Sequence, residues 1–154
     1  MKISFKGDYA IKSLVYLASQ YTRNKDSRSQ IGEISKIQDI PVKFLEHILL
    51  TLKNAGYVKS HRGTKGGYSI AKDPEKITLG EIIRLIDGPT SSIACVSRSR
   101  NSYCDFEKKC VLKPIFEEVR DAISDIIDNI TFKDLVEKEE KLREKDKQLA
   151  MYYI

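Results

Sequence analysis

The sequence contains no uninterrupted run of about 18 apolar residues, the length that a helix needs to cross a bilayer. We therefore expect no transmembrane segment and no membrane partner. The first residues also lack the pattern of a secretory signal peptide, because Asp8 and Lys12 interrupt the apolar stretch and no small-residue cleavage site follows. The expected location is the cytoplasm.

Cysteine is scarce and its number is odd, since the only thiols are those of Cys95, Cys104 and Cys110. An odd number in a reducing compartment argues against a disulfide scaffold. The C-x2-C pairs typical of zinc ribbons and zinc fingers are missing, and gaps of eight and five residues do not match a ferredoxin motif. Three clustered thiols instead indicate a metal or redox site.

The usual combinations of catalytic residues are also missing. The sequence shows no Ser-His-Asp set, no paired carboxylates and no nucleotide-binding motif. Neither His47 nor His61 has an identifiable catalytic partner, and we expect both to face DNA or solvent rather than to bind a metal ion. The protein is therefore expected not to be an enzyme.

Charge is distributed unevenly along the 154 residues. Residues 1–80 contain 14 Lys and Arg against 7 Asp and Glu, a net charge of +7, whereas residues 81–154 contain 13 against 15, a net charge of −2. These halves give the +5 of the whole chain. A basic N-terminal half suggests contact with a polyanion, although many proteins without a nucleic-acid partner carry such a bias.

Apolar residues in the first third recur with helical spacing. The pattern predicts a helix over residues 8–20, a polar loop over residues 21–28 and a short helix over residues 31–37. A third helix should begin at Pro41, because proline suits the first helical position, and end at Gly56, which suits a left-handed cap. The stripe that we expect this third helix to bury consists of Phe44, Leu45, Ile48, Leu49 and Leu52.

Two short strands, residues 57–60 and 68–71, are predicted on either side of the basic, glycine-rich sequence RGTKGG. Two helices, a turn, a third helix and a basic hairpin follow one another in the order of a winged helix-turn-helix. The predicted fold class is therefore mainly α with a small β-wing. A long dimerisation helix follows it.

In a winged helix-turn-helix the third helix enters the major groove and its early residues reach base edges. Those positions here are Val42, Lys43, Glu46 and His47. Arg62 and Lys65 lie among the glycines of the wing, where an arginine on a narrow tip can enter the minor groove. Any one of these charges could be merely solvated, and it is their order along the chain that indicates DNA binding.

The second half begins with a capping box at Thr78 and Glu81, which predicts a helix that stops at Gly88. Residues 90–111 have no periodicity and contain all three cysteines. The longest apolar stripe of the chain then runs over residues 112–130, and a last, highly charged helix should be capped by Thr131 and Asp134. A stripe this long needs a partner surface, in its own chain or in a second copy, and we expect a second copy.

These segments predict three regions. Residues 1–80 form a winged helix-turn-helix DNA-binding domain, residues 81–111 a helix and a cysteine-bearing sensor loop, and residues 112–154 the dimerisation helix and the charged C-terminal helix.

Nearly the whole chain resembles the Rrf-type winged-helix transcription regulators, whose groups include IscR, NsrR, RirA and CymR. The resemblance rests on MKISFKGDYAIKSL, IPVKFLEHILLTLKNAGYVKSHRGTKGGYSI, ITLGEIIRLIDGP, the cysteine cluster and VRDAISDIIDNITFKDLV. It implies a homodimeric repressor or activator that binds imperfect palindromes in double-stranded DNA. Lys43 and Glu46 match base-reading positions and Arg62 matches the wing arginine. A dimer must place its two recognition helices ~34 Å apart.

The resemblance also implies an iron–sulfur cluster held by Cys95, Cys104 and Cys110, with the 2Fe–2S form favoured over 4Fe–4S. Many family members have five residues in both gaps between these cysteines, whereas the first gap here has eight. Some members have a histidine ligand three residues after the last cysteine, and that position is Lys113 here.

The three cysteines therefore leave the fourth ligand of the cluster unidentified. Asp8 stands where the nitric-oxide-sensing group has an acidic ligand contributed by the partner subunit. Asp8 could equally be an acidic residue favoured by the dipole at a helix start. Asp105 and Glu107 are alternative ligands that lie nearer to the cysteines.

Two other interpretations remain open. The C-terminal sequence MYYI resembles the end of CymR-type regulators, which lack a cluster and respond to a partner enzyme of cysteine synthesis. The cysteines would then be thiol sensors or have no role. A small electron-transfer protein could use the same cysteines, but it would leave the winged helix without a function.

Overall fold

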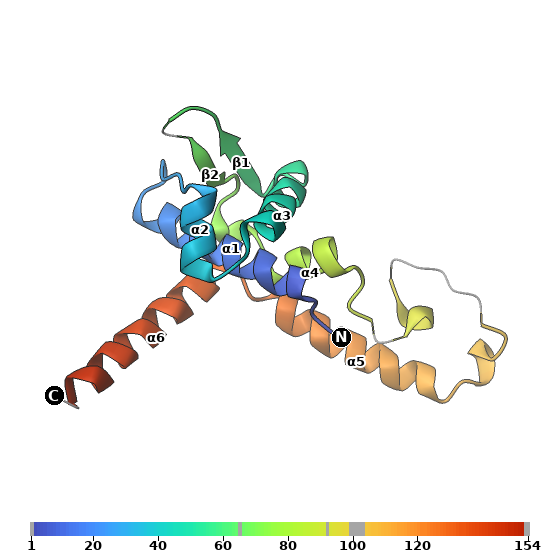
Figure 1. Cartoon of the computed structure of the whole chain (residues 1–154). Coiled ribbons are helices and arrows are strands. Elements are labelled where there is room, and N and C mark those ends of the chain that lie inside the picture. The colour runs from blue at the N-terminus through green and yellow to red at the C-terminus, as the bar shows by residue number, and fades with distance from the viewer. Residues whose placement is uncertain (1, 65, 92, 99–103, 153–154) are drawn as a thin grey trace.

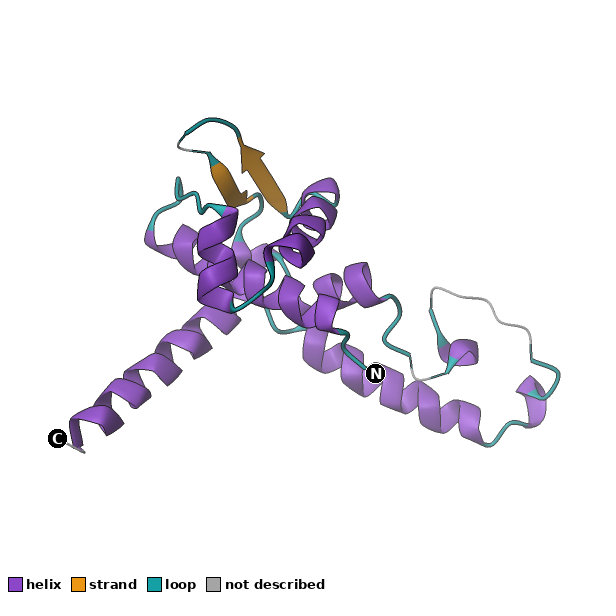
Figure 2. Ribbon diagram, in the orientation of Figure 1, coloured by secondary structure: helices purple, strands orange, loops and turns teal. Residues whose placement is uncertain are grey.

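The computed structural model describes residues 2–64, 66–91, 93–98 and 104–152 of the chain (Figure 1). Its helices are α1 (Phe5–Arg23), α2 (Ile31–Gln38), α3 (Val42–Asn54), α4 (Leu79–Asp87), α5 (Leu112–Asp128) and α6 (Phe132–Tyr152), and its strands are β1 (Val58–His61) and β2 (Gly67–Ile70). Single 3-10 turns are formed by Pro74–Lys76, Ala94–Val96 and Glu107–Lys109. The predicted class, mainly α with a small two-stranded wing, is confirmed (Figure 2).

Helix α1 is longer than its sequence pattern predicts. It starts at Phe5 because the side chain of Ser4 caps it by accepting a hydrogen bond from the Gly7 N–H at 3.0 Å. It continues to Arg23, so the loop predicted from residue 21 was wrong by three residues. The extra turn is polar on its outer side, which the apolar periodicity alone does not register.

The third helix confirms most of its predicted stripe but not all of it. The side chains of Leu45, Ile48, Leu49 and Leu52 are buried. Phe44 is 60% exposed, and the prediction that it is buried was wrong. One residue is roughly 100° around a helix, so the face that buries Leu45 turns Phe44 outward. Its ring instead packs edge-on against Tyr9 of α1, with 6.4 Å between ring centroids.

The wing is a two-stranded antiparallel hairpin in which Val58 pairs with Ile70 and His61 pairs with Gly67. Both strands are shifted by one residue from the predicted ranges. Strand β2 also pairs with the segment that precedes α2, because Ser29 and Tyr68 exchange two backbone hydrogen bonds of 2.9 and 2.8 Å. The base of the wing is therefore tied to the start of α2.

One hydrophobic core joins these elements. Its fully buried side chains come from α1, α2, α3 and α4, from Ile40 and Ile77 in the connecting segments, and from Phe132 at the start of α6. Helix α1 lies at the centre, in contact with α2, α3, α4 and α6. We call α1–α3 with the two strands the body. Figure 1 shows α5 and α6 extending away from the body in different directions.

Helix α4 begins at the predicted capping box. The Thr78 side chain accepts a hydrogen bond from the Glu81 N–H, and the Glu81 carboxylate accepts one from the Thr78 N–H. The next cap is also present, since Thr131 and Asp134 bond to each other at the start of α6. These two starts lie side by side, because Thr78 and Thr131 form an isolated antiparallel bridge.

Candidate DNA interface and cysteine loop

The first two turns of α3 present a row of exposed side chains. Val42, Lys43, Glu46 and His47 are all exposed, whereas the opposite side of the helix is buried in the core. Among the described residues, no hydrogen bond or ion pair occupies the side chains of Lys43 and Glu46. Such side chains are available to base edges and phosphates.

The tip of the wing carries Arg62, which is exposed. Lys65, the other predicted wing contact, lies outside the described residues. The turn is tight enough to require glycine at position 66, because an added Cβ would lie 2.4 Å from the carbonyl oxygen of His61. Behind the tip, His61 Nε2 and Ser69 Oγ are hydrogen-bonded across the strands at 2.8 Å.

A hollow of about 300 Å³ lies between the wing and the start of α2. It is lined by Gln30, Ile31, Ser60, His61, Gly63, Gly66, Gly67 and Tyr68. Gln30 precedes α2 without giving it a side-chain cap, so the first N–H groups of α2 are available to an anion. This hollow was not among the features predicted from the sequence. The sequence does contain one indication of it: the short second helix is preceded by glutamine, whereas serine, threonine or aspartate would be expected to cap its first N–H groups.

The cysteine loop holds three free, half-buried thiols. Cys95 lies on the 3-10 turn Ala94–Val96, which is fixed to α5 by a hydrogen bond of 2.8 Å from Arg120 Nη1 to the Val96 carbonyl. Cys104 and Cys110 flank the 3-10 turn Glu107–Lys109. Within the described part of the chain, no three His, Cys, Asp or Glu side chains lie close enough together to hold a metal ion. The structure therefore places the three predicted cysteine ligands on one loop without bringing them together.

Asp8, the predicted ligand from the partner subunit, lies in the first turn of α1. Its carboxylate forms an ion pair of 2.7 Å with Lys12, one turn further along the helix. The hydrogen bond that the Lys12 ammonium donates to the Asp8 carboxylate raises the pKa of Lys12. Both side chains are about half exposed, and an exposed pair of this kind contributes about 0.5 kcal/mol or less. Asp8 also borders a hollow of about 550 Å³ together with Lys2, Ile3, Ser4 and Phe5.

Helix α5 turns much of its apolar stripe away from its own chain. Ile127 is its only buried residue, whereas Ile115 is 55% and Ile126 is 63% exposed. Val111 and Leu112, at the start of the helix, are exposed as well. One chain therefore leaves a continuous apolar face uncovered along α5.

The order and geometry of these elements match a known family over most of the chain. The model of the Rrf2 family, described as an iron-dependent transcriptional regulator, matches residues 3–138. The chain belongs to the Rrf2 family. The rrf2-like helix-turn-helix transcriptional regulator of Rhodobacter capsulatus is 39% identical to it over 137 residues, which are 87% of this chain and 91% of that relative.

Two Rrf2-family regulators with solved structures share the fold. CymR of Bacillus subtilis, whose structure is described as that of the global cysteine regulator, is 29% identical over the full length of both chains. Its structure matches 90% of this chain and 98% of its own with a TM-score of 0.74. The IscR of T. potens is 30% identical and covers 92% of this chain and 90% of its own, with a TM-score of 0.73.

Family membership settles the biochemical class. The protein is a DNA-binding transcription regulator, and its relatives are regulators rather than enzymes. Among the described helices, none combines the length and apolar character needed to span a bilayer.

Proposed function

We propose that two copies of this chain bind an imperfect palindrome, with α3 in the major groove and the wing in the adjacent minor groove. The observation that carries this proposal is the row of exposed, unpaired side chains on the first turns of α3. Lys43 and Arg62 supply positive charge, and Glu46 can accept a hydrogen bond from a cytosine amino group. His47, Val42 and Lys65 complete the proposed contact set. We expect the regulator to act in the cytoplasm.

The test uses a duplex selected by the wild-type protein from a random library. Replacing both Lys43 and Arg62 by alanine should weaken binding to this duplex by about 2 kcal/mol or more and flatten its salt dependence. Arg143→Ala is the matched control, because Arg143 lies on α6 and, among the residues that the structure describes, pairs only with Glu139. Undiminished affinity of the double variant would refute the proposed interface.

We propose that α5 forms the dimer interface. Its uncovered apolar face is continuous, and each large apolar side chain that a partner covers contributes about 1.5–3 kcal/mol. A second copy of the same face would bury both stripes at once. Such an isologous contact also supplies the two-fold symmetry that a palindrome requires.

The cysteine loop is proposed to hold an iron–sulfur cluster through Cys95, Cys104 and Cys110. The family model is described as iron-dependent, and thiolates are the donors that such clusters take. When bound, a cluster would supply reactivity toward oxidants and nitric oxide. The chain itself supplies the link to the rest of the molecule, because Arg120 holds the Val96 carbonyl, next to Cys95, against α5.

Iron and sulfide analysis of anaerobically purified protein tests this proposal. The wild type should contain iron and acid-labile sulfide, and Cys104→Ser should contain far less of both. A 2Fe–2S absorption spectrum is expected. Asp8→Ala should change that spectrum if Asp8 of the partner is the fourth ligand, whereas Asp105→Ala should leave it unchanged. Protein without iron or sulfide would contradict the cluster.

A second candidate function is a cluster-free regulator of sulfur metabolism like CymR. The full-length match to CymR favours it, as does the finding that the three thiols form no metal-holding group among the described residues. In that case the partner would be an enzyme of cysteine synthesis or the signal would be thiol oxidation. Colourless anaerobic protein whose DNA affinity changes on treatment with hydrogen peroxide would support this function over the cluster.

A further inference from the structure

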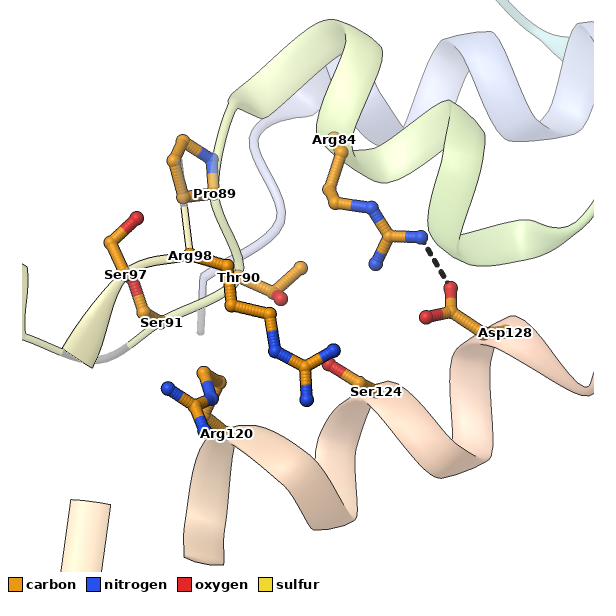
Figure 3. A pocket seen from close by; sticks show the side chains of 9 residues that line it. All are labelled: Arg84, Pro89, Thr90, Ser91, Ser97, Arg98, Arg120, Ser124 and Asp128. Atoms are coloured by element: carbon orange, nitrogen blue, oxygen red, sulfur yellow. Dashed lines mark hydrogen bonds and ion pairs between the residues drawn. The ribbon is translucent and has the colours of Figure 1, made fainter. Parts of the chain in front are cut away.

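A polar pocket of about 280 Å³ lies between the end of α4, the cysteine loop and α5. Figure 3 shows the side chains that line it: Arg84, Pro89, Thr90, Ser91, Ser97, Arg98, Arg120, Ser124 and Asp128. Three of these are arginines from three different segments. Arg84 comes from α4, Arg98 from the loop and Arg120 from α5. Neither the DNA interface nor the proposed cluster uses this pocket.

Carboxylates lie beside the three guanidinium groups, but only one of them belongs to the lining of the pocket. Asp128 is the single acidic residue of the lining, and it pairs with Arg84. Asp121, beside the pocket, is shared by Arg120 at 2.8 and 2.9 Å and by Arg98 at 2.8 Å. The hydrogen bonds to Asp121, and to a lesser extent the nearby charge of Glu117, raise the pKa of the Arg120 guanidinium group. Within the lining itself, three cations face a single carboxylate.

The guanidinium groups also have donors to spare. A guanidinium carries five N–H donors, and the hydrogen bonds described for Arg84 and Arg98 use one each. Arg98 is 72% exposed and can turn toward a ligand, whereas Arg120 is only 17% exposed and is held in place by Asp121 and the Val96 carbonyl. A fixed arginine and a movable one therefore face the same space.

Hydroxyl groups complete the lining. Thr90 and Ser91 lie just after α4, and Ser124 lies one turn after Arg120 on α5. Guanidinium and hydroxyl donors together are the groups that recognise phosphate and sulfate oxygens. A planar carboxylate accepts bidentate hydrogen bonds in its own plane, from one or two directions. The oxygens of a tetrahedral oxyanion point in several directions, so they can accept hydrogen bonds from donors on three different segments.

We propose that this pocket binds a small tetrahedral oxyanion, either free phosphate or sulfate or the phosphate monoester of a small molecule. The anion would join α4, which packs on α1, to the cysteine loop and α5. The inference goes beyond the proposed function, because it depends neither on the DNA contacts nor on iron.

A partner subunit on α5 would leave the pocket open. Arg120, Ser124 and Asp128 are four residues apart and share one face of the helix. The exposed apolar residues Ile115 and Ile126 lie on the opposite face, as 3.6 residues per turn requires. A dimer formed through the apolar face therefore keeps the arginines accessible to solvent.

Calorimetric titration of the full-length protein in chloride buffer tests the proposal, with inorganic phosphate, sulfate, phenyl phosphate and acetate as probes. Phosphate or sulfate should bind saturably, and acetate should bind much more weakly. Tighter binding of phenyl phosphate would identify a monoester as the ligand, and tighter binding of inorganic phosphate a free ion. No saturable binding of any tetrahedral anion, or equal binding of acetate, would overturn the proposal.

Variants locate the binding. Arg98→Ala should weaken phosphate binding by about tenfold, because it removes a charge-assisted contact from an exposed position that the fold does not need. Asp128→Asn keeps the shape and removes the competing carboxylate, so it should tighten binding. Arg62→Ala and Arg143→Ala are the controls and should leave binding unchanged. A loss with Arg62→Ala but not with Arg98→Ala would place the anion at the DNA interface and refute the pocket.

Discussion

The body and α5 differ in how much apolar surface a single chain can bury. In the body, the large side chains that face inward on α1 and α3 are almost completely covered. In α5, most of the equally apolar stripe is exposed, and the neighbouring thiols are only half buried. The body therefore completes its core within one chain, whereas α5 and the cysteine loop, the proposed dimer interface and sensor, leave apolar side chains and thiols for further components to cover.

The largest expected effect lies in the body, between two neighbouring residues of α3. Leu49 is 0% exposed and its neighbour Leu50 is 52% exposed. Leu49→Ala should lower the free energy of unfolding by about 2–5 kcal/mol, because it removes packed methyl groups and leaves a cavity. Leu50→Ala should change it by less than about 0.5 kcal/mol. Urea unfolding followed by circular dichroism measures both, and equal losses would contradict the burial that defines the body.

The second prediction concerns α5. Ile115→Asp places a charge on the uncovered apolar face and should weaken dimerisation by more than about tenfold, since a buried unpaired charge is costly. Analytical ultracentrifugation over a range of concentrations measures the change. Lys138→Asp, at an exposed position of α6, is the control and should leave the dimer intact. If Ile115→Asp remained fully dimeric, α5 would not be the interface.

A smaller effect is expected where the body meets the rest of the chain. Thr78→Ala removes half of the capping box of α4 and should cost about 1 kcal/mol of stability. Thr64→Ala, at an exposed position near the tip of the wing, should cost almost nothing. Thermal unfolding of the two variants side by side gives the difference, and the account fails here if the Thr64 variant is the less stable one.

The smallest effect is a pH dependence at the start of α6. Hydrogen bonds from Thr131 lower the pKa of Asp134, so the carboxylate contributes stability above the pKa of the unfolded chain and loses it as the pH falls through the lowered folded value. The difference in stability between wild type and Asp134→Asn should therefore shrink below about pH 4. Urea unfolding at neutral and acidic pH measures it. A difference that grew in acid would have the wrong sign.

Local features of the fold could be predicted from the sequence because they depend on neighbours along the chain. The capping box of Thr78, the left-handed Gly56 (φ +79°) and the buried stripe of α3 are of this kind. The prediction that Phe44 is buried was wrong, because in the sequence an apolar residue next to the buried stripe cannot be distinguished from a member of it. Only the three-dimensional packing shows that the ring lies outside the core, against Tyr9.

Features that join distant segments could not be predicted. The bridge from Ser29 to Tyr68 and the burial of Phe132 in the core of the body depend on how the elements pack. The sequence also does not predict that three arginines line one pocket, because positions 84, 98 and 120 have no periodic relation. The DNA-contact residues, the cysteine ligands and the division at residues 80 and 111 stay predictions.

The central claim is that two copies of α3 read one palindrome, and Glu46 tests it most directly. Selection of binding sites from a random duplex library should be carried out with the wild type and with Glu46→Ala. The variant should lose base preference at one position in each half-site, with the two positions related by the two-fold symmetry of the site. Unaltered preference at every position would contradict the claim that α3 reads the DNA.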